Sequence, residues 1–256
     1  MNWKRRKEAK VASARRERPE TALAALVLLA ALTAPALAGD RALIDLIGFS
    51  PDARYFAFEE FGIQDGSGFA YSSIYLLDLT NDSWVVGTPI RAQAADEERG
   101  LADTRAEAGR NAAAHLRDFD ISVPVDVATM LGDGTPEIDG KTLSFGVPGY
   151  APGQVMDKHH LQLRSFETGA ANPCSEWFDS APLGFELVLS DAETDRVIYR
   201  DGTLPRSRAC PTDYRLYAVA LPFMSQDIAS GVAIVSYYPQ GFEGPDRRFL
   251  AVPLAH

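Results

Sequence analysis

The sequence predicts a mainly β protein, an antiparallel sandwich or a partly closed barrel-like sheet of about ten strands, with one inserted helical segment. Short runs rich in aromatic and β-branched residues recur along the chain, which is typical of strands. Turn-forming residues separate these runs at short intervals. The pattern does not alternate strands with long helices, so a parallel α/β core is not expected.

The first predicted unit is a three-stranded meander. Residues 54–61 (RYFAFEEF) follow the turn Ser50-Pro51-Asp52, and residues 73–79 and 84–86 supply the next two strands. Because side chains alternate across a strand, Phe56 and Phe58 share one face of the first strand while other aromatic side chains lie on its second face. Both faces need cover, which predicts a central position in its sheet.

The inserted helical segment is predicted at residues 92–119. Alanine and charged residues dominate this range, and Leu101, Ala108, Ala112 and Leu116 recur at near-helical spacing. Two glycines inside the range each lower the helix preference by roughly 1 kcal/mol. Short alternating runs then predict the remaining strands at 121–125, 142–145, 159–166, 185–199 (a hairpin), 214–221, 231–238 and 248–254.

The N-terminal 38 residues have the three-part pattern of a secretory signal peptide. Eight Lys and Arg residues come first, an apolar run at 22–34 follows, and Ala36-Leu37-Ala38 supplies small residues for cleavage. The apolar run is shorter than the roughly 20 residues that a membrane-spanning helix needs, although a retained anchor is the alternative. We expect cleavage between Ala38 and Gly39, which leaves residues 39–256 as a single secreted β-rich domain with the helical insertion near 92–119.

The charge of the chain restricts its partners. The formal net charge is −10, and the leader removes eight basic but only three acidic residues, so the mature domain is more acidic still. A negative surface repels phosphate backbones and anionic lipid. We therefore expect no nucleic-acid partner and, after signal cleavage, no stable membrane insertion.

Two cysteines, Cys174 and Cys210, predict one disulfide, since an oxidising compartment favours pairing them. A redox pair normally has the tight Cys-x-x-Cys spacing, which is not present here. The polar, turn-like flanks at 172–173 and 211–212 predict a surface staple that encloses the hairpin 185–199.

Candidate catalytic residues are few. His159 and His160 form the one histidine cluster, but neighbours on a strand point to opposite faces. The same alternation separates Glu59 from Glu60, so they do not form the carboxylate pair of a glycosidase. The familiar hydrolase and nucleotide-binding motifs are not present.

Acidic turns offer a calcium hypothesis but no cofactor. Asp65, Asp133 and Asp139 lie in glycine-rich turns that could present oxygen ligands. Their spacing does not fit an EF-hand loop, and ordinary turn chemistry explains Asp beside Gly. We expect no cofactor and no dedicated metal site.

Two resemblances add to this interpretation. Residues 47–86, with the Ser50-Pro51-Asp52 turn and an Ile-Tyr-x-x-Asp-Leu strand, resemble one blade of a TolB-type β-propeller, which makes a small propeller the alternative fold. The segments 39–42, 47–52, 54–60 and 64–68, placed after a signal peptide, resemble a family of predicted secreted bacterial proteins with a domain of unknown function. This second resemblance implies an exported bacterial protein with no assigned activity. Together with the signal peptide, we expect a secreted protein, periplasmic or extracellular, in a Gram-negative-type bacterium.

Two functions remain open from the sequence. We expect a non-catalytic periplasmic or extracellular binding protein that recognises an unknown protein or envelope component. The alternative is a secreted hydrolase with a dispersed site in which His159 or His160 works with a distant carboxylate. A deep pocket that holds one of these histidines beside two carboxylates would favour the hydrolase.

Overall fold

The computed structural model describes residues 39–133, 138–191, 194–241 and 244–255, so the expected signal peptide lies outside the described residues. Their strands form three antiparallel sheets. Sheet 1 contains β1 (Leu43–Phe49), β2 (Tyr55–Ile63), β3 (Ala70–Asp78), β4 (Ser83–Trp84) and β5 (Ile90–Gln93). Sheet 2 contains β6 (Val125–Met130), β11 (Pro211–Pro222), β12 (Val232–Pro239) and β13 (Arg248–Pro253). Sheet 3 contains β7 (Thr142–Pro148), β8 (Val155–Glu167), β9 (Leu183–Ser190) and β10 (Asp195–Arg200).

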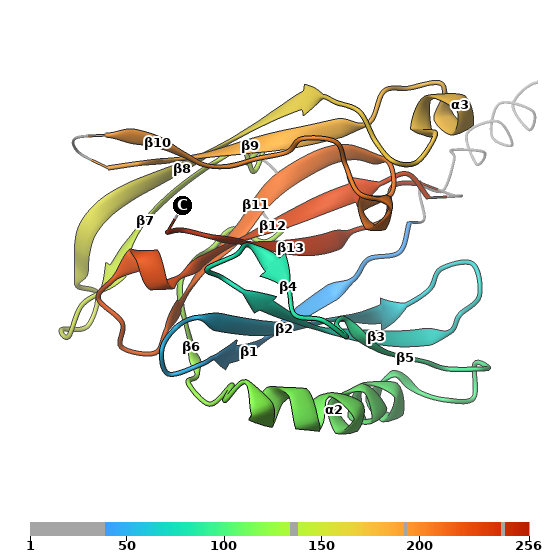
Figure 1. Cartoon of the computed structure of the whole chain (residues 1–256), viewed down its shortest axis with the longest axis horizontal. Helices are drawn as coiled ribbons and strands as arrows, with labels where there is room; N and C mark the ends of the chain where they lie inside the picture. Colours follow the sequence, from blue (N-terminus) through green and yellow to red (C-terminus); the bar gives the residue numbers. More distant parts are fainter. Residues whose placement is uncertain (1–38, 134–137, 192–193, 242–243, 256) are drawn as a thin grey trace, which may run out of the picture. The chain divides into compact units, whose positions relative to one another are not determined.

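Sheet 2 lies between the other two sheets, as Figure 1 shows. Alternate side chains of β12 enter two different cores: Val235 packs against sheet 3, whereas Ile234 packs against sheet 1. Both side chains are fully buried. This explains why β12 (VAIVSYYP) is almost continuously apolar, since a sheet that is covered on both faces has no polar side.

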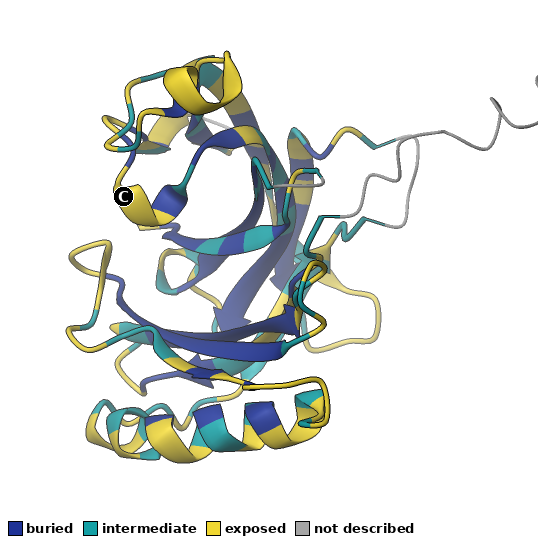
Figure 2. Ribbon diagram, turned by 90° about the vertical axis from the view of Figure 1, so that its right-hand side faces the viewer, coloured by how far each residue is buried: buried dark blue, intermediate teal, exposed yellow. Residues whose placement is uncertain are grey.

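Helix α2 (Leu101–Asp118) covers the outer face of sheet 1. Its small buried residues Ala108 and Ala112 pack against Ile74 of β3, and Figure 2 shows this buried stripe with the exposed side of the helix turned outward. Arg105 fastens the helix, because its guanidinium donates to Glu59 Oε2 (2.6 Å) and to Asp45 Oδ2 (2.8 Å).

The predicted meander is confirmed as part of sheet 1. The turn Ser50-Pro51-Asp52 joins β1 to β2, where the Tyr55 N–H donates to Ser50 Oγ (2.9 Å) and the Ser50 hydroxyl donates to Asp52 Oδ1 (2.6 Å). Strand β2 is central, with β1 and β3 as neighbours. The mainly β, antiparallel fold class is therefore confirmed, with two α-helices in the described part of the chain.

Several expected elements need correction. The described sheets are stacked layers, so they support neither the propeller alternative nor the TolB-type blade resemblance. The helical segment expected from residue 92 begins only at Leu101, because residues 90–93 pair with β3 as strand β5. The strand expected at 121–125 forms instead at Val125–Met130, while Val123 makes only an isolated bridge to Phe49. Strand β1 and the short helix α3 (Cys174–Phe178) are further elements that were not expected from the sequence.

Candidate functional site

The candidate site is a cleft along β13, which is a free edge of sheet 2. It consists of two adjoining pockets, with volumes of about 310 Å³ and about 230 Å³, that share Ser207 and Tyr237 in their walls. We call the larger one the polar pocket and the smaller one the aromatic pocket. Together they are the edge cleft.

Strand alternation aims three side chains of β3 into the polar pocket. Tyr71, Ser73 and Tyr75 share the face toward sheet 2, whereas Ser72 and Ile74 face α2. Arg91 of β5 is the register partner of Ser73, so it reaches the same pocket from the neighbouring strand. The opposite wall comes from the register pair Tyr237 and Arg248 on β12 and β13.

Arg248 organises the base of the polar pocket. Its guanidinium donates to Tyr71 Oη (2.7 Å), Asp40 Oδ2 (3.0 Å) and Asp246 Oδ2 (3.3 Å). Burial lowers the pKa of Arg248, but the surrounding Tyr71, Glu60 and Asp40 raise it on balance, so the group stays charged. Burial also raises the pKa of Tyr71 well above its usual range, so its hydroxyl stays neutral.

Glu60 is the titratable carboxyl of the polar pocket. Only 3% of the residue is exposed, and burial raises the pKa of Glu60 to about 7. The Arg248 guanidinium, with Nε 3.9 Å from Glu60 Oε1, and the Phe249 N–H, which donates to Oε2 (2.9 Å), favour the ionised form but do not overcome burial. A carboxyl that changes charge near neutral pH inside a cleft is typical of functional sites.

Several polar groups of the polar pocket have no hydrogen-bond partner within the described ranges. The hydroxyls of Ser73, Tyr75 and Tyr237 are in this class, and so is the exposed guanidinium of Arg91. Buried polar groups in proteins are nearly always hydrogen-bonded. Hydroxyls that line a cavity without a protein partner are therefore available to a ligand.

A buried arginine, Arg208, forms part of the wall of the aromatic pocket and contacts several polar side chains around it. Arg208 lies within hydrogen-bond range of Tyr199 Oη (3.3 Å), Tyr214 Oη (3.4 Å) and Asp201 Oδ2 (3.5 Å). Burial raises the pKa of Tyr199 to about 12, so this tyrosine is neutral and contributes hydrogen bonds rather than charge. Trp84, which is 38% exposed, packs edge-on against Tyr75 and marks the boundary between the two pockets.

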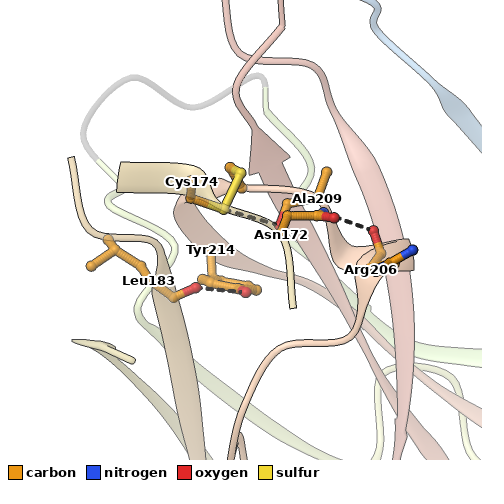
Figure 3. Close-up of a disulfide and its surroundings, with 7 residues drawn as sticks. Asn172, Cys174, Leu183, Arg206, Ala209 and Tyr214 are labelled. Carbon is orange, nitrogen blue, oxygen red and sulfur yellow. Dashed lines mark hydrogen bonds between the residues drawn. A yellow bond between two sulfur atoms is a disulfide. The ribbon is translucent and has the colours of Figure 1, made fainter. Parts of the chain in front are cut away.

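The disulfide between Cys174 and Cys210 is confirmed, with an S–S distance of 2.07 Å and a Cα–Cα distance of 5.6 Å. Figure 3 shows it beside Tyr214 and the turn that contains Arg206 and Ala209. The expectation of a surface staple is wrong, because both cysteines are buried (2% and 5% exposed). Cys174 is the first residue of α3, and Cys210 directly precedes β11. Cys210 lies two residues after Arg208, and both Ser207 and Arg208 line the edge cleft. The disulfide therefore restricts the position of this wall of the cleft.

The two predicted histidines do not line the edge cleft. His160 lies on the exposed face of sheet 3, where its Nδ1 is 2.8 Å from Ser144 Oγ of the neighbouring strand. The His159 ring packs against Phe145 on the other face, and its buried Nδ1 has no hydrogen-bond partner within the described ranges. No described carboxylate forms a hydrogen bond or ion pair with either imidazole.

The predicted carboxylates are also dispersed. Glu59 faces α2 and pairs with Arg105, whereas Glu60 faces the cleft. Asp133 forms ion pairs with Arg247 and Arg41, Asp139 accepts the Lys141 N–H (2.8 Å), and Asp65 is exposed in its turn. The residues that the structure describes contain no group of three or more His, Cys, Asp and Glu that could hold a metal.

Most residues of the edge cleft carry no sequence signal of their own. Tyr71, Tyr75 and Tyr237 look like core aromatics of strands, and Arg91 and Arg248 look like ordinary strand-end charges. The one available signal is Glu60, a carboxylate in the middle of an apolar strand.

Comparisons with known proteins give one family. Residues 57–255 match the model of a family described as "Predicted secreted protein (DUF2259)". Searches of curated proteins and of solved structures found no significant match. Within the described ranges, no helix has the length and apolar character that a membrane span requires.

Proposed function

The chain belongs to this family of predicted secreted proteins with a domain of unknown function, and we propose that it is a non-catalytic binding protein that holds its ligand in the edge cleft. The ligand is a segment or component of another molecule outside the cytoplasm. The proposal is supported by the convergence of unpaired hydroxyls and one unpaired cation in the polar pocket.

The polar pocket offers both donors and acceptors to such a ligand. The hydroxyls of Ser73, Tyr75 and Tyr237 can each donate, and Arg91 adds a positive charge at the mouth. Glu60 can accept when ionised and donate when protonated. A few well-placed polar groups within aromatic walls are typical of binding pockets.

Thermal-shift measurements against a panel of organic acids, oligosaccharides and short peptides test the proposal. We expect one class to raise the melting temperature of the wild type, and Tyr237→Phe and Arg91→Gln to reduce the shift. Tyr150→Phe is the control, because Tyr150 is 80% exposed and lies outside both pockets of the edge cleft. A shift that both cleft variants preserve would contradict binding in the cleft, and turnover of the bound compound would contradict a non-catalytic role.

The hydrolase alternative is favoured by one observation, the 2.8 Å contact between Ser144 Oγ and His160 Nδ1. A serine beside an imidazole is the start of a nucleophilic dyad, although no described carboxylate orients this imidazole. Hydrolysis of a nitrophenyl ester that is lost in both Ser144→Ala and His160→Gln supports this alternative. Activity that survives in both variants, or no activity in the wild type, contradicts it.

We also propose that export removes residues 1–38 and releases the domain into the periplasm. In the folded domain, a side chain at Gly39 would meet the Pro245 carbonyl oxygen at 2.2 Å, so the chain has no room for a larger residue there. Mass spectrometry of the protein recovered from the periplasm should find Gly39 as the first residue. A recovered protein that retains the basic leader would contradict cleavage at this position.

A further inference from the structure

We infer that the edge cleft receives an extended peptide segment of a partner protein, which joins sheet 2 as an additional strand beside β13. This inference rests on the proposed function and names its ligand. The backbone of β13 is a feature of the edge cleft separate from its side chains.

The hydrogen-bond pattern shows which backbone groups of β13 face the cleft. The Phe249 N–H donates to Glu60 Oε2 (2.9 Å) rather than to β12, so Phe249 is a residue whose backbone points away from the ladder. In an antiparallel pair this direction alternates, so the N–H and carbonyl of Ala251 point the same way. Ala251 lines the aromatic pocket.

Part of this edge is already covered by the protein itself. The Arg247 N–H donates to the Asp40 carbonyl (2.7 Å), and Arg41 makes a parallel bridge with Arg247. The Glu60 carboxylate then stands at Phe249, where a partner strand would place a carbonyl. From Leu250 to Pro253 no described strand pairs with the edge.

The two pockets lie along the unpaired part of β13, between residues of sheet 1 and residues of the β10–β11 region. Tyr75, Leu77 and Trp84 of sheet 1 form one wall of the two pockets, and Tyr199 and Arg208 form the other. Sheet 1 and sheet 3 thus flank the β13 edge on both sides. The edge from Leu250 to Pro253 is unpaired among the described strands, although Ala251 is buried within the cleft. An unpaired sheet edge is a template for strand addition, which supplies affinity through main-chain hydrogen bonds and specificity through side-chain pockets.

The side chains of the cleft define the chemistry of the peptide. Arg91 forms no ion pair within the described ranges, so it suits an acidic side chain or a terminal carboxylate. Leu77 and Trp84 suit an apolar side chain in the aromatic pocket. We expect the peptide to be extended, to carry an acidic group for the polar pocket and to place an apolar side chain at Trp84.

Selection from a library of random hexapeptides, displayed against the immobilised mature protein, provides the probe. Binding of a selected peptide is then measured by fluorescence anisotropy. Ala251→Pro removes the outward N–H, and an edge strand tolerates proline at such a position. We expect this variant to weaken binding about tenfold, as for one lost hydrogen bond, and Arg91→Gln to weaken binding of acidic peptides. The control Tyr150→Phe changes a residue that is 80% exposed and lies outside both pockets, so it should bind the peptide like the wild type.

A second measurement uses only the wild-type protein, so it does not depend on correct folding of the proline variant. Amide hydrogen exchange of the wild type should show that the selected peptide slows exchange at Ala251. A peptide that binds without protecting this amide overturns strand addition but leaves a ligand in the cleft, provided that Tyr237→Phe weakens it. Loss of sensitivity to both Tyr237→Phe and Arg91→Gln overturns the proposed function as well.

Two further outcomes also decide against the inference. A library that yields no binder shows that the cleft does not take extended peptides, and small-molecule thermal shifts then test the proposed function separately. If the wild type self-associates and Ala251→Pro abolishes this self-association, a second copy of the chain occupies the β13 edge.

Discussion

Glu59 and Glu60 show how adjacent residues of one type acquire different chemistry. Both side chains are buried, yet Glu59 receives a bidentate contact from Arg105, whereas Glu60 is 3.9 Å from its nearest arginine nitrogen. Glu59, which is paired with Arg105, holds α2 against sheet 1. Glu60 has no cation in such close contact, and burial raises its pKa to about 7, so it changes charge near neutral pH. Strand alternation alone separates the two roles.

The raised pKa of Glu60 predicts a pH dependence of stability. Between about pH 4.5 and 7 the folded state keeps a proton on Glu60 that the unfolded chain has released, so the free energy of unfolding falls as the pH rises. The contribution is fully present below about pH 4.5, is lost above about pH 7 and amounts to roughly 3 kcal/mol. Most of this amount is lost between pH 5 and pH 8. Denaturant unfolding should therefore show that the free energy of unfolding changes between these two pH values by about 2–3 kcal/mol less in Glu60→Gln than in the wild type.

The control for this prediction is Glu59→Gln. It removes the neighbouring carboxylate on the helix side of β2 and leaves Glu60 intact. The pH dependence between pH 5 and pH 8 should therefore persist in this variant. An unchanged dependence in Glu60→Gln would show that another group causes it.

At the scale of single elements, α2 owes its position to packing more than to its own sequence. Gly100 precedes it without a side-chain cap, and Gly109 lies in its interior, where an added Cβ would meet no atom within 4 Å. Gly109→Ala should raise the free energy of unfolding by about 0.5–1 kcal/mol, because alanine loses less backbone entropy in a helix. Urea unfolding measures it. Gly68→Ala is the opposing control and should destabilise, since Gly68 has a φ of +69°.

The disulfide controls a second element, the segment between β10 and β11. Cys174→Ala with Cys210→Ala should cost about 4 kcal/mol in the chain-entropy account of a loop closed over a separation of 36 residues. Hydrogen exchange should increase first in the β9–β10 hairpin and in residues 201–210, because the bridge encloses the former and ends the latter. Equal exchange in both proteins, measured by mass spectrometry, would show that the buried cluster of Arg208, Tyr199 and Tyr214 holds this wall alone.

At the scale of the whole domain, the three stacked sheets make a direct prediction for β12. Ile234 and Val235 point to opposite faces, and both are fully buried. Ile234→Ala and Val235→Ala should therefore each cost on the order of 2 kcal/mol. In a sandwich of two sheets one of the two faces would be solvated, and the corresponding variant would be nearly neutral.

The control for the β12 variants is Val127→Ala in β6 of the same sheet. This valine is 42% exposed, so its truncation removes little buried surface. The expected change in the free energy of unfolding is below about 1 kcal/mol. A large effect at only one of Ile234 and Val235 would contradict the position of sheet 2 between two sheets.

Features that depend on local pattern could be predicted from the amino-acid sequence. The Ser50-Pro51-Asp52 turn, the alternation in β2 and the paired spacing of the β9–β10 hairpin are set by neighbouring residues, so they could be predicted from the chain. The disulfide could be predicted as well, because two cysteines in a secreted chain allow one pairing. The start of α2 could not, since residues 90–93 become a strand only by pairing with β3.

The stacking of the sheets and the meeting of distant polar residues could not be predicted from the sequence, because they depend on long-range packing. The edge cleft joins Glu60 and Tyr75 of sheet 1 with Tyr237 and Arg248 of sheet 2, and these residues are up to 188 positions apart. No local periodicity encodes which face of one sheet packs against which edge of another. Burial of Glu60, and with it the raised pKa, arises only when β13 packs against sheet 1, because desolvation depends on the surrounding atoms and not on neighbours in the chain.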